Sequence, residues 1–232
     1  MKFLEIDRFF DDYTIEFDEN IATEKTLLAV HPHNAVTCGL TVNVYNGKLG
    51  NILVCASRML LNTPLLGLAH KLSGMTSVDP SNLKVQMKKK RNIAILPGGF
   101  EEATLTTPKE NRVYLQRKGF IKYALRHGYK VHPVFIFGEH KIFYTMERFE
   151  KFRLLLNKLK LVGVIFWSRF GIIPECKNEV HTVVGKGIQM PEIAEPTDQD
   201  VDKYHAMFVE GLKEVYNNHK AQYADNKNLK IY

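Results

Sequence analysis

Short apolar segments alternate along this chain with stretches of helical periodicity, and that alternation limits the folds available to it. Buried strands of parallel or mixed sheets are rich in Val, Ile and Leu. Five segments fit that description: Thr26 to Val30, Asn51 to Ala56, Asn92 to Leu96, Val131 to Phe137 and Thr182 to Val184. Strands that alternate with helices build α/β layers. We therefore predict an α/β fold with a single domain, in which helices flank a mixed β-sheet.

Capping residues mark the helices between these strands. Proline follows both Thr63 and Asp79, which favours helix starts at those points. Glycine ends two helical patterns, at Gly74 and Gly128. The helical period is carried after residue 64 by Leu65, Leu68, Ala69 and Leu72, and it recurs from Gln116 to His127. A last helix is predicted after Thr197, because Asp200 three residues later approximates a capping box.

The net charge of +7 is distributed unevenly along the 232 residues. Residues 1–24 hold eight acidic and two basic side chains, so we predict an acidic N-terminal segment at 1–24 followed by one domain at 25–232. A basic domain favours an anionic partner, such as phosphates, anionic lipid headgroups or nucleic acid. The run Lys88-Lys89-Lys90-Arg91 fits a solvated helix end, and no aromatic binding motif accompanies it, so nucleic acid is not an expected partner.

Cysteine content and hydropathy limit the setting of the protein. Three scattered cysteines are too few for a disulfide framework, which indicates a reducing compartment. The first residues lack the apolar stretch of a secretory signal. The purely apolar run from Leu161 to Trp167 is far shorter than the roughly 20 residues that span a bilayer. We expect no transmembrane span and a protein of the cytosol or of a cytosol-facing membrane surface.

Residues 141–173 combine aromatic and basic side chains and allow two interpretations. Seven basic and two acidic residues lie between Lys141 and Arg169. The segment could form an amphipathic helix and a strand packed on the sheet, with its basic residues solvated. It could instead insert aromatic side chains into a membrane while its cations meet anionic headgroups. The aromatic residues in question are Phe143, Tyr144, Phe149, Phe152, Phe166, Trp167 and Phe170.

Two polar motifs follow predicted strands. His31-Pro32-His33-Asn34 comes after the first strand, and Leu96-Pro97-Gly98-Gly99-Phe100-Glu101-Glu102-Ala103 follows the third. Catalytic groups of open α/β sheets gather beyond the carboxyl ends of strands. Paired glycines allow close approach of a ligand to backbone N–H groups, and the carboxylate after them can reach a histidine of the first motif. No third ligand cluster supports a metal ion, so we expect none.

The order of these motifs, with three further blocks, resembles the second diacylglycerol acyltransferase family, which includes monoacylglycerol and wax-alcohol acyltransferases. The further blocks are Arg117-Lys118-Gly119-Phe120, Pro133 to Glu139, and Thr182 to Gly185 with Pro196 to His205. The resemblance covers about residues 26–223. It implies the fold of glycerolipid acyltransferases, acyl-CoA as acyl donor without another cofactor, and a lipid alcohol as acceptor.

The sequence departs from the family at three points. The family's His-Pro-His-Gly becomes His31-Pro32-His33-Asn34, and its Gly-Gly-Ala-x-Glu-Ala becomes Gly98-Gly99-Phe100-Glu101-Glu102-Ala103. The family's N-terminal hydrophobic hairpin is missing. We therefore expect peripheral attachment to the cytosolic face of a membrane, the endoplasmic reticulum or a lipid droplet.

The resemblance assigns roles to the motif residues. His33 is the expected general base on the acceptor hydroxyl, since a neutral histidine near pH 7 can take that proton. Glu102 is expected to orient His33 or the hydroxyl, and His31 to brace the turn. Gly98 and Gly99 are expected to stabilise an oxyanion, with Asn34 and Phe100 near the substrate. Arg117 and Lys118 are expected to contact phosphates of acyl-CoA.

Two alternatives stay open at this point. Cys38 follows the second histidine by five residues and could act as an acyl-accepting nucleophile, although buried cysteines are more often small apolar residues. The chain could also be an acyltransferase-like protein that binds acyl chains or lipid surfaces without turnover. Acyl-CoA consumption with any lipid alcohol distinguishes the enzyme from that binding protein.

Overall fold

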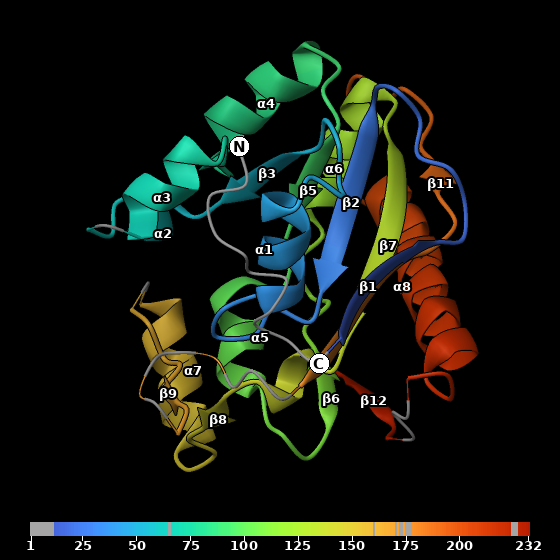
Figure 1. The fold of residues 1–232 in the computed structure, drawn as a ribbon. Coiled ribbons are helices and arrows are strands. Elements are labelled where there is room, and N and C mark those ends of the chain that lie inside the picture. The colour runs from blue at the N-terminus through green and yellow to red at the C-terminus, as the bar shows by residue number, and fades with distance from the viewer. Residues whose placement is uncertain are drawn as a thin grey trace.

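The computed structural model of the protein describes residues 12–64, 66–159, 161–169, 171, 174, 178–223 and 227–232. Its centre is a sheet of eight strands in the order β1-β10-β7-β2-β5-β3-β4, with β11 pairing β7 (Figure 1). The strands are β1 (Asp12–Phe17), β2 (Thr26–His31), β3 (Leu53–Ala56), β4 (Thr76–Ser77), β5 (Ile93–Ile95), β7 (Lys130–Phe137), β10 (Glu179–Val184) and β11 (Ile188–Gln189).

Parallel pairing dominates the middle of this sheet. β2 pairs in parallel with both β5 and β7, and β3 pairs in parallel with β4 and β5. β10 and β11 run antiparallel to β7. The predicted α/β fold with a mixed sheet is confirmed, and the five predicted strands correspond to β2, β3, β5, β7 and β10.

Side chains of the central strands alternate between two apolar layers, as the period of a strand requires. Leu27 and Ala29 of β2 belong to the layer that packs on α6 (Gly119–His127) and α8 (Asp198–His219). Leu28 and Val30 belong to the opposite layer, with α1 (Cys38–Tyr45). Figure 1 shows α1 in front of the sheet and α6 behind it. Both faces of the sheet are therefore covered.

The remaining elements lie at both ends of the sheet, with α4 (Pro80–Lys88) at one end and α5 (Gly99–Leu105) and α7 (Glu150–Lys158) at the other (Figure 1). They also include α2 (Arg58–Leu61), α3 (Leu66–Leu72) and a 3₁₀ turn at Glu139–Lys141. Two small sheets complete the set, formed by β6 (Asn111–Val113) with β12 (Leu229–Ile231) and by β8 (Tyr144–Thr145) with β9 (Phe166–Trp167).

The capping residues read from the sequence set the helix ends. Thr197 Oγ1 accepts the Asp200 N–H at 3.1 Å, and the Thr197 N–H donates to the Asp200 carboxylate at 2.9 Å, so the capping box before α8 is confirmed. α4 begins at Pro80, and α6 ends at Gly128, whose φ of 62° is the left-handed value that glycine adopts easily. The cations from Lys88 to Arg91 are exposed at the end of α4.

Part of the acidic N-terminal segment lies in the sheet. Residues 12–17 form β1, an edge strand parallel to β10, with Asp12 opposite Glu179 and Phe17 opposite Val184. The predicted boundary at residue 25 therefore does not separate an acidic arm from the domain. The sequence did not predict this half-buried strand, because its acidic side chains masked the apolar pattern. An edge strand of a sheet tolerates such side chains. Residues 1–11 lie outside the described residues.

Candidate active site

The two polar motifs meet at one edge of the sheet. β2 and β5 are adjacent and parallel, with Leu27 opposite Ile93 and Ala29 opposite Ile95. Both strands therefore end at the same edge, and the segments that follow them lie there. His31 is the last residue of β2, and α5 begins at Gly99 just beyond β5. The sequence prediction that these motifs lie together is confirmed by their contacts.

Glu102 is the hub of those contacts. Its side chain is fully buried in α5, and its Oε2 lies 2.8 Å from His31 Nδ1. The same carboxylate accepts the backbone N–H of His33, and the Tyr114 N–H at 2.7 Å. A buried carboxylate needs several donors to offset its desolvation, and these three supply them. Glu102 thus fixes the turn between the two histidines.

The ring of His33 has different surroundings from the ring of His31. His31 is fully buried against Phe208, with ring centroids 6.0 Å apart, so it holds the turn from inside. His33 is only partly buried, and its Nδ1 lies 2.7 Å from the carbonyl oxygen of Asn34. A carbonyl only accepts, so Nδ1 carries the hydrogen and Nε2 keeps its lone pair. Glu102 therefore reaches the His33 backbone and not the ring that was expected to act as base.

Burial lowers the pKa of His33 below its usual value. Desolvation disfavours the protonated ring, and the nearby Arg117 adds to that effect, while Glu102 opposes it. The ring is therefore neutral near pH 7. A neutral imidazole with a free Nε2 can take a proton from a hydroxyl, which is the requirement for a general base.

The side chain of Asn34 has a structural role beside the His33 ring. Its Nδ2 donates to the Glu139 carbonyl oxygen at 2.5 Å, and its Oδ1 accepts the Ala35 N–H at 2.7 Å. The side chain is fully buried, so the structure does not bring it to the substrate position expected for it. Asn34 instead ties the turn after β2 to the turn after β7.

Glu139, at the end of the block from Pro133 to Glu139, anchors α1. The carboxylate of Glu139 accepts the N–H groups of Cys38 at 2.7 Å and Gly39 at 2.9 Å, at the helix start where such donors lack partners. Burial raises the pKa of Glu139 to about 7. Gly39 is required there, since a Cβ would lie 2.6 Å from Ile136 Cγ2.

Cys38 does not have the surroundings of a nucleophile. Its side chain is buried, and burial together with the Glu139 carboxylate raises the pKa of its thiol well above the usual value. The thiolate is the nucleophilic form, and this environment disfavours it. The structure thus argues against the alternative mechanism. Cys176, the third cysteine of the chain, lies outside the described residues.

The Gly-Gly pair shapes the turn that leads into α5. A Cβ on Gly98 would lie 2.2 Å from Glu102 Oε2, so glycine lets the carboxylate approach. Gly99 has φ of 57°, and a Cβ there would lie 2.3 Å from a guanidinium nitrogen of Arg117. The Gly99 N–H bonds the Leu96 carbonyl at 3.3 Å, so it is not free to stabilise an oxyanion as expected.

Arg117 and Lys118 are separated by the fold. The guanidinium of Arg117 packs over Gly99 and donates to the Glu101 carboxylate. Lys118 pairs with Asp202 of α8 at 2.7 Å, both side chains being exposed. Arg117 therefore belongs to the site around His33, whereas Lys118 lies against another helix.

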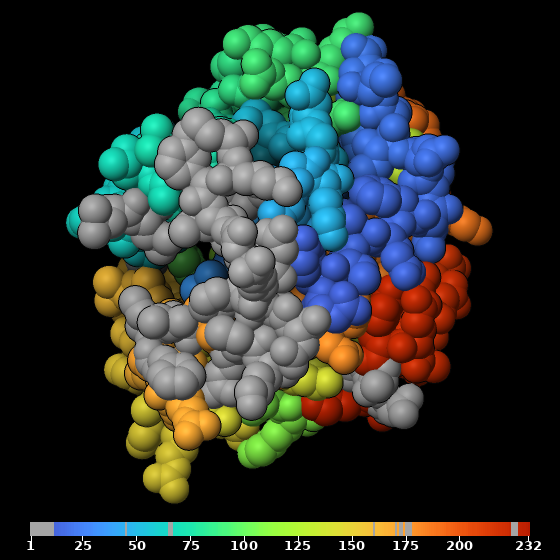
Figure 2. Space-filling model, in the orientation of Figure 1, coloured from blue at the N-terminus to red at the C-terminus, as the bar shows by residue number. Residues whose placement is uncertain are grey.

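A cavity of about 230 Å³ lies beside His33. His33, Gly99, Phe100 and Arg117 line it, and most of its remaining wall is apolar. That wall includes Leu40, Val54, Ala56, Leu60, Met75, Val78 and Leu96, together with His70. Figure 2 shows a hollow between the teal atoms of α2 and α3 and the gold atoms of α7, with blue and green atoms at its bottom. The arrangement places the His33 ring beside a mostly apolar space.

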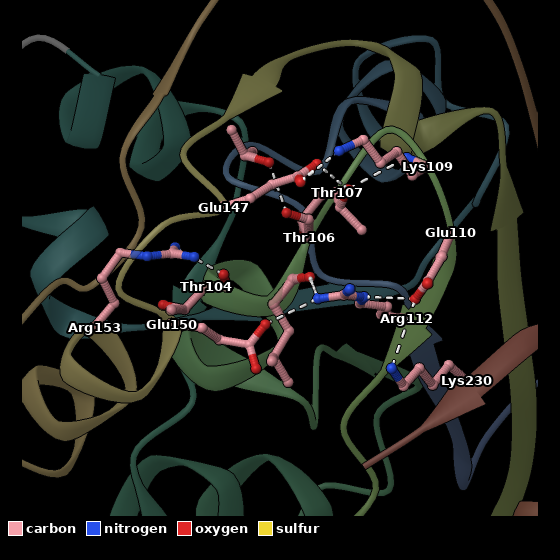
Figure 3. Close-up of polar contacts among 12 residues, drawn as sticks. Thr104, Thr106, Thr107, Lys109, Glu110, Arg112, Glu147, Glu150, Arg153 and Lys230 are labelled. Carbon is pink, nitrogen blue, oxygen red and sulfur yellow. Dashed lines mark hydrogen bonds and ion pairs between the residues drawn. The ribbon is translucent and has the colours of Figure 1, made fainter.

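α7 packs on α5 through polar contacts that the sequence did not reveal. Asn157 Nδ2 donates to the Phe100 carbonyl at 3.1 Å and to Thr104 Oγ1 at 2.7 Å. Arg153 donates to the Thr104 carbonyl at 2.9 Å (Figure 3). In the same figure Arg112 joins Glu150 of α7 at 3.0 Å and Glu110 at 2.9 Å. Because α5 carries Phe100 and Glu102, α7 braces the helix that builds the site.

No cluster of three potential metal ligands occurs among the described parts of the chain. Within the same residues, no helix is long and apolar enough to cross a bilayer. The polar groups described above are histidine, carboxylate and arginine side chains around a turn and a cavity.

A sequence model of diacylglycerol acyltransferases matches residues 4–232, nearly the whole chain. The chain belongs to the diacylglycerol acyltransferase family. Diacylglycerol O-acyltransferase 2 of Dictyostelium discoideum is 32% identical over 253 aligned residues, covering 97% of this chain and 76% of the relative. The mouse acyl-CoA wax alcohol acyltransferase 1 is 26% identical, over 90% of this chain and 70% of that protein. The resemblance seen in the motifs is confirmed, and the protein is an acyltransferase.

Relatives of this acyltransferase differ in length from it. The chain spans 63% of human diacylglycerol O-acyltransferase 2, to which it is 27% identical. Among solved structures, the 1-acyl-sn-glycerophosphate acyltransferase PlsC of Thermotoga maritima has a TM-score of 0.56 and 13% identity, over 89% of this chain and 72% of that one. At that identity the likeness concerns the fold, and it agrees with the predicted glycerolipid acyltransferase architecture.

Proposed function

We propose that this acyltransferase moves an acyl group from acyl-CoA to the hydroxyl of a lipid alcohol, a diacylglycerol or monoacylglycerol first of all. The observation that carries the proposal is the position of His33. Its ring is neutral, its Nδ1 is fixed by the Asn34 carbonyl, and it lines the mostly apolar cavity. Two relatives are named as acyltransferases of diacylglycerol and of wax alcohol, and these names agree with a lipid acceptor.

In the proposed reaction His33 Nε2 takes the proton of the acceptor hydroxyl while the hydroxyl oxygen attacks the thioester carbonyl carbon. The carbonyl π electrons move onto oxygen, and the resulting oxyanion would be stabilised by the Arg117 guanidinium at the same side of the cavity. The oxyanion pair then re-forms the carbonyl as the C–S bond breaks, and the leaving CoA thiolate takes the proton from His33 Nε2, which gives the ester and free CoA. Glu102 and His31 touch no substrate in this scheme; they hold the turn that positions His33.

The apolar cavity is the proposed place of the acyl chain. A thioester carbonyl beside His33 and Arg117 would direct its hydrocarbon between Val54, Ala56 and Met75. Burial of apolar area would stabilise the chain by about 25 cal/mol per Å². Arg117 is also the better candidate for contact with a CoA phosphate, because Lys118 already pairs with Asp202 away from the cavity.

A lipid surface is the proposed partner, because α7 turns its apolar side chains outward. Arg153 and Asn157 are its buried residues, at 3% and 7% exposure, whereas Phe149 at its N-cap is 74% exposed. Phe152, Leu155 and Leu159 are also exposed. A helix in water normally presents the reverse pattern. α7 therefore favours the interfacial interpretation of residues 141–173, although Phe143 and Phe166 pack together inside the protein. Phe170 lies outside the described residues.

α3 shows the same inversion. Its apolar period does not face the core, since Leu68 and Leu72 are exposed and the inward side presents Gly67 and His70. A Cβ on Gly67 would lie 2.4 Å from the Leu61 carbonyl oxygen, so the close packing of α3 on α2 selects this side. Both helices lie at the left edge of the molecule in Figures 1 and 2. A lipid surface against them would lie next to the hollow between them, where a lipid alcohol could enter.

The test of this function is ester formation by the purified protein. A labelled long-chain acyl-CoA is supplied with diacylglycerol, monoacylglycerol or fatty alcohol in vesicles. We expect a labelled neutral ester and stoichiometric release of free CoA with at least one acceptor. Binding of acyl-CoA without ester formation from any acceptor would contradict the proposal and support the acyl-binding protein instead.

A further inference from the structure

His70 places a polar ring on the apolar wall of the cavity. The residue lies on the inward side of α3, at 6% exposure, and lines the same cavity as His33. Its Nδ1 is buried and has no hydrogen-bond partner among the residues that the structure describes. Two hydroxyl groups also line the cavity, and neither bonds His70: Thr41 donates to the Thr37 carbonyl at 2.7 Å, and Ser57 accepts the Leu60 N–H at 3.2 Å.

An unpaired buried nitrogen is unfavourable, so its partner is expected to come from the cavity. Native proteins leave few such groups without a hydrogen bond. The cavity beside His70 has room for a ligand segment or for water molecules. A plain hydrocarbon chain placed there would displace water and leave Nδ1 unpaired. An oxygen atom in the ligand would restore the hydrogen bond.

The charge of the ring selects the kind of oxygen. Burial lowers the pKa of His70, so the ring is neutral at pH 7, with one nitrogen as donor and the other as acceptor. A neutral ring suits an uncharged oxygen, such as a hydroxyl or an ester carbonyl. A phosphate or carboxylate beside His70 would find no positive charge on this ring to offset its desolvation.

We propose that His70 is a specificity-determining residue that hydrogen-bonds, through Nδ1, an uncharged oxygen of the lipid substrate inside the cavity. The inference rests on the proposed function. The oxygen could belong to the acceptor, as the second hydroxyl or ester carbonyl of an acylglycerol, or to an oxygenated acyl chain. In either case the enzyme prefers the oxygen-bearing substrate over its plain hydrocarbon counterpart, because only the former satisfies His70.

The experiment compares wild-type protein with His70→Leu and His70→Asn. One arm measures kcat/KM for monooleoylglycerol and for oleyl alcohol with palmitoyl-CoA. The other measures kcat/KM for hydroxypalmitoyl-CoA and for palmitoyl-CoA with oleyl alcohol. We expect His70→Leu to reduce the preference for the oxygen-bearing substrate about tenfold in one arm, which identifies the source of the oxygen. Asn carries an amide near the place of Nδ1 and should retain much of the preference.

Stability and binding measurements separate this role from a structural one. Leu at this position removes an unpaired buried nitrogen, so the melting temperature should be kept or raised. Equal loss of turnover with every substrate, or unchanged preferences in both arms, would overturn the proposal. If wild-type protein forms no ester at all, the proposed function fails. In that case calorimetry measures the affinities of the four substrates for wild-type and His70→Leu protein. We expect the preference in affinity for the oxygen-bearing substrate to fall about tenfold in one arm for His70→Leu. Unchanged preferences in both arms would overturn the proposal for His70.

Discussion

His31 and His33 are two residues apart and have different tasks in this account. The sequence singled out both, and the family resemblance favoured His33 as base. Only the structure shows that Glu102 bonds the ring of His31 and the backbone of His33. That division depends on which side of the turn each ring occupies, and residue spacing does not determine it. The third donor to Glu102, the Tyr114 N–H, belongs to a segment twelve residues further on that no motif marked.

Glu102→Gln is predicted to weaken both folding and turnover. The amide can accept with one atom only, and its NH₂ group would face the donors of His31, His33 or Tyr114. We expect the free energy of unfolding to fall by about 1–3 kcal/mol and kcat to fall about tenfold or more. Denaturant titration and steady-state kinetics measure the two effects. Glu210→Gln, at an exposed pair with Lys213, is the matched control and should stay within about 0.5 kcal/mol.

The pH dependence follows from the lowered pKa of His33. The neutral ring is the active form, so kcat/KM should be constant above pH 7 and fall as the pH drops through the lowered pKa, below about 6.5. One proton should describe the acidic limb. A limb centred well above pH 7 would show that His33 is protonated where we infer a free Nε2.

At the scale of elements, sequence periodicity located the core strands and the helix that became α3, but it did not predict which side of α3 and α7 faces outward. Strands β2, β5 and β7 and helix α8 follow their apolar patterns because both faces of the sheet are buried. β1 escaped notice because its partly exposed edge carries acidic residues. α7 and α3 break the usual rule, since each turns apolar residues outward and buries polar or small ones. Such an inversion becomes visible only when the packing partner is known, here α5 for Asn157 and α2 for Gly67.

The two sides of α7 should respond differently to substitution. Phe152→Ser with Leu155→Ser removes exposed apolar area, so vesicle binding should weaken while the unfolding free energy changes by less than about 0.5 kcal/mol. Asn157→Leu removes the partner of Phe100, Thr104 and Gly163, and should cost about 1–3 kcal/mol of stability. Vesicle sedimentation and thermal unfolding measure the pair. Equal loss of stability in both variants would show that Phe152 and Leu155 pack in the core instead of facing outward.

At the scale of the whole molecule, the protein combines a net positive charge, exposed apolar side chains on α3 and α7, and a cavity lined by His33. We propose that the exposed apolar side chains of α3 and α7 attach it peripherally to a lipid surface. High salt or alkaline carbonate should then release the protein from membranes into the supernatant. Retention after both washes, without a lipid modification, is the contrary result.

The central claim is that His33 is the general base of an acyl transfer. Its most direct test is the rate of ester formation by folded His33→Ala protein, with labelled long-chain acyl-CoA and an acylglycerol acceptor. The account predicts a fall in kcat of about 10²-fold or more with an unchanged melting temperature, because Glu102 still bonds the backbone at this position. A folded His33→Ala protein that forms ester at the wild-type rate would contradict it.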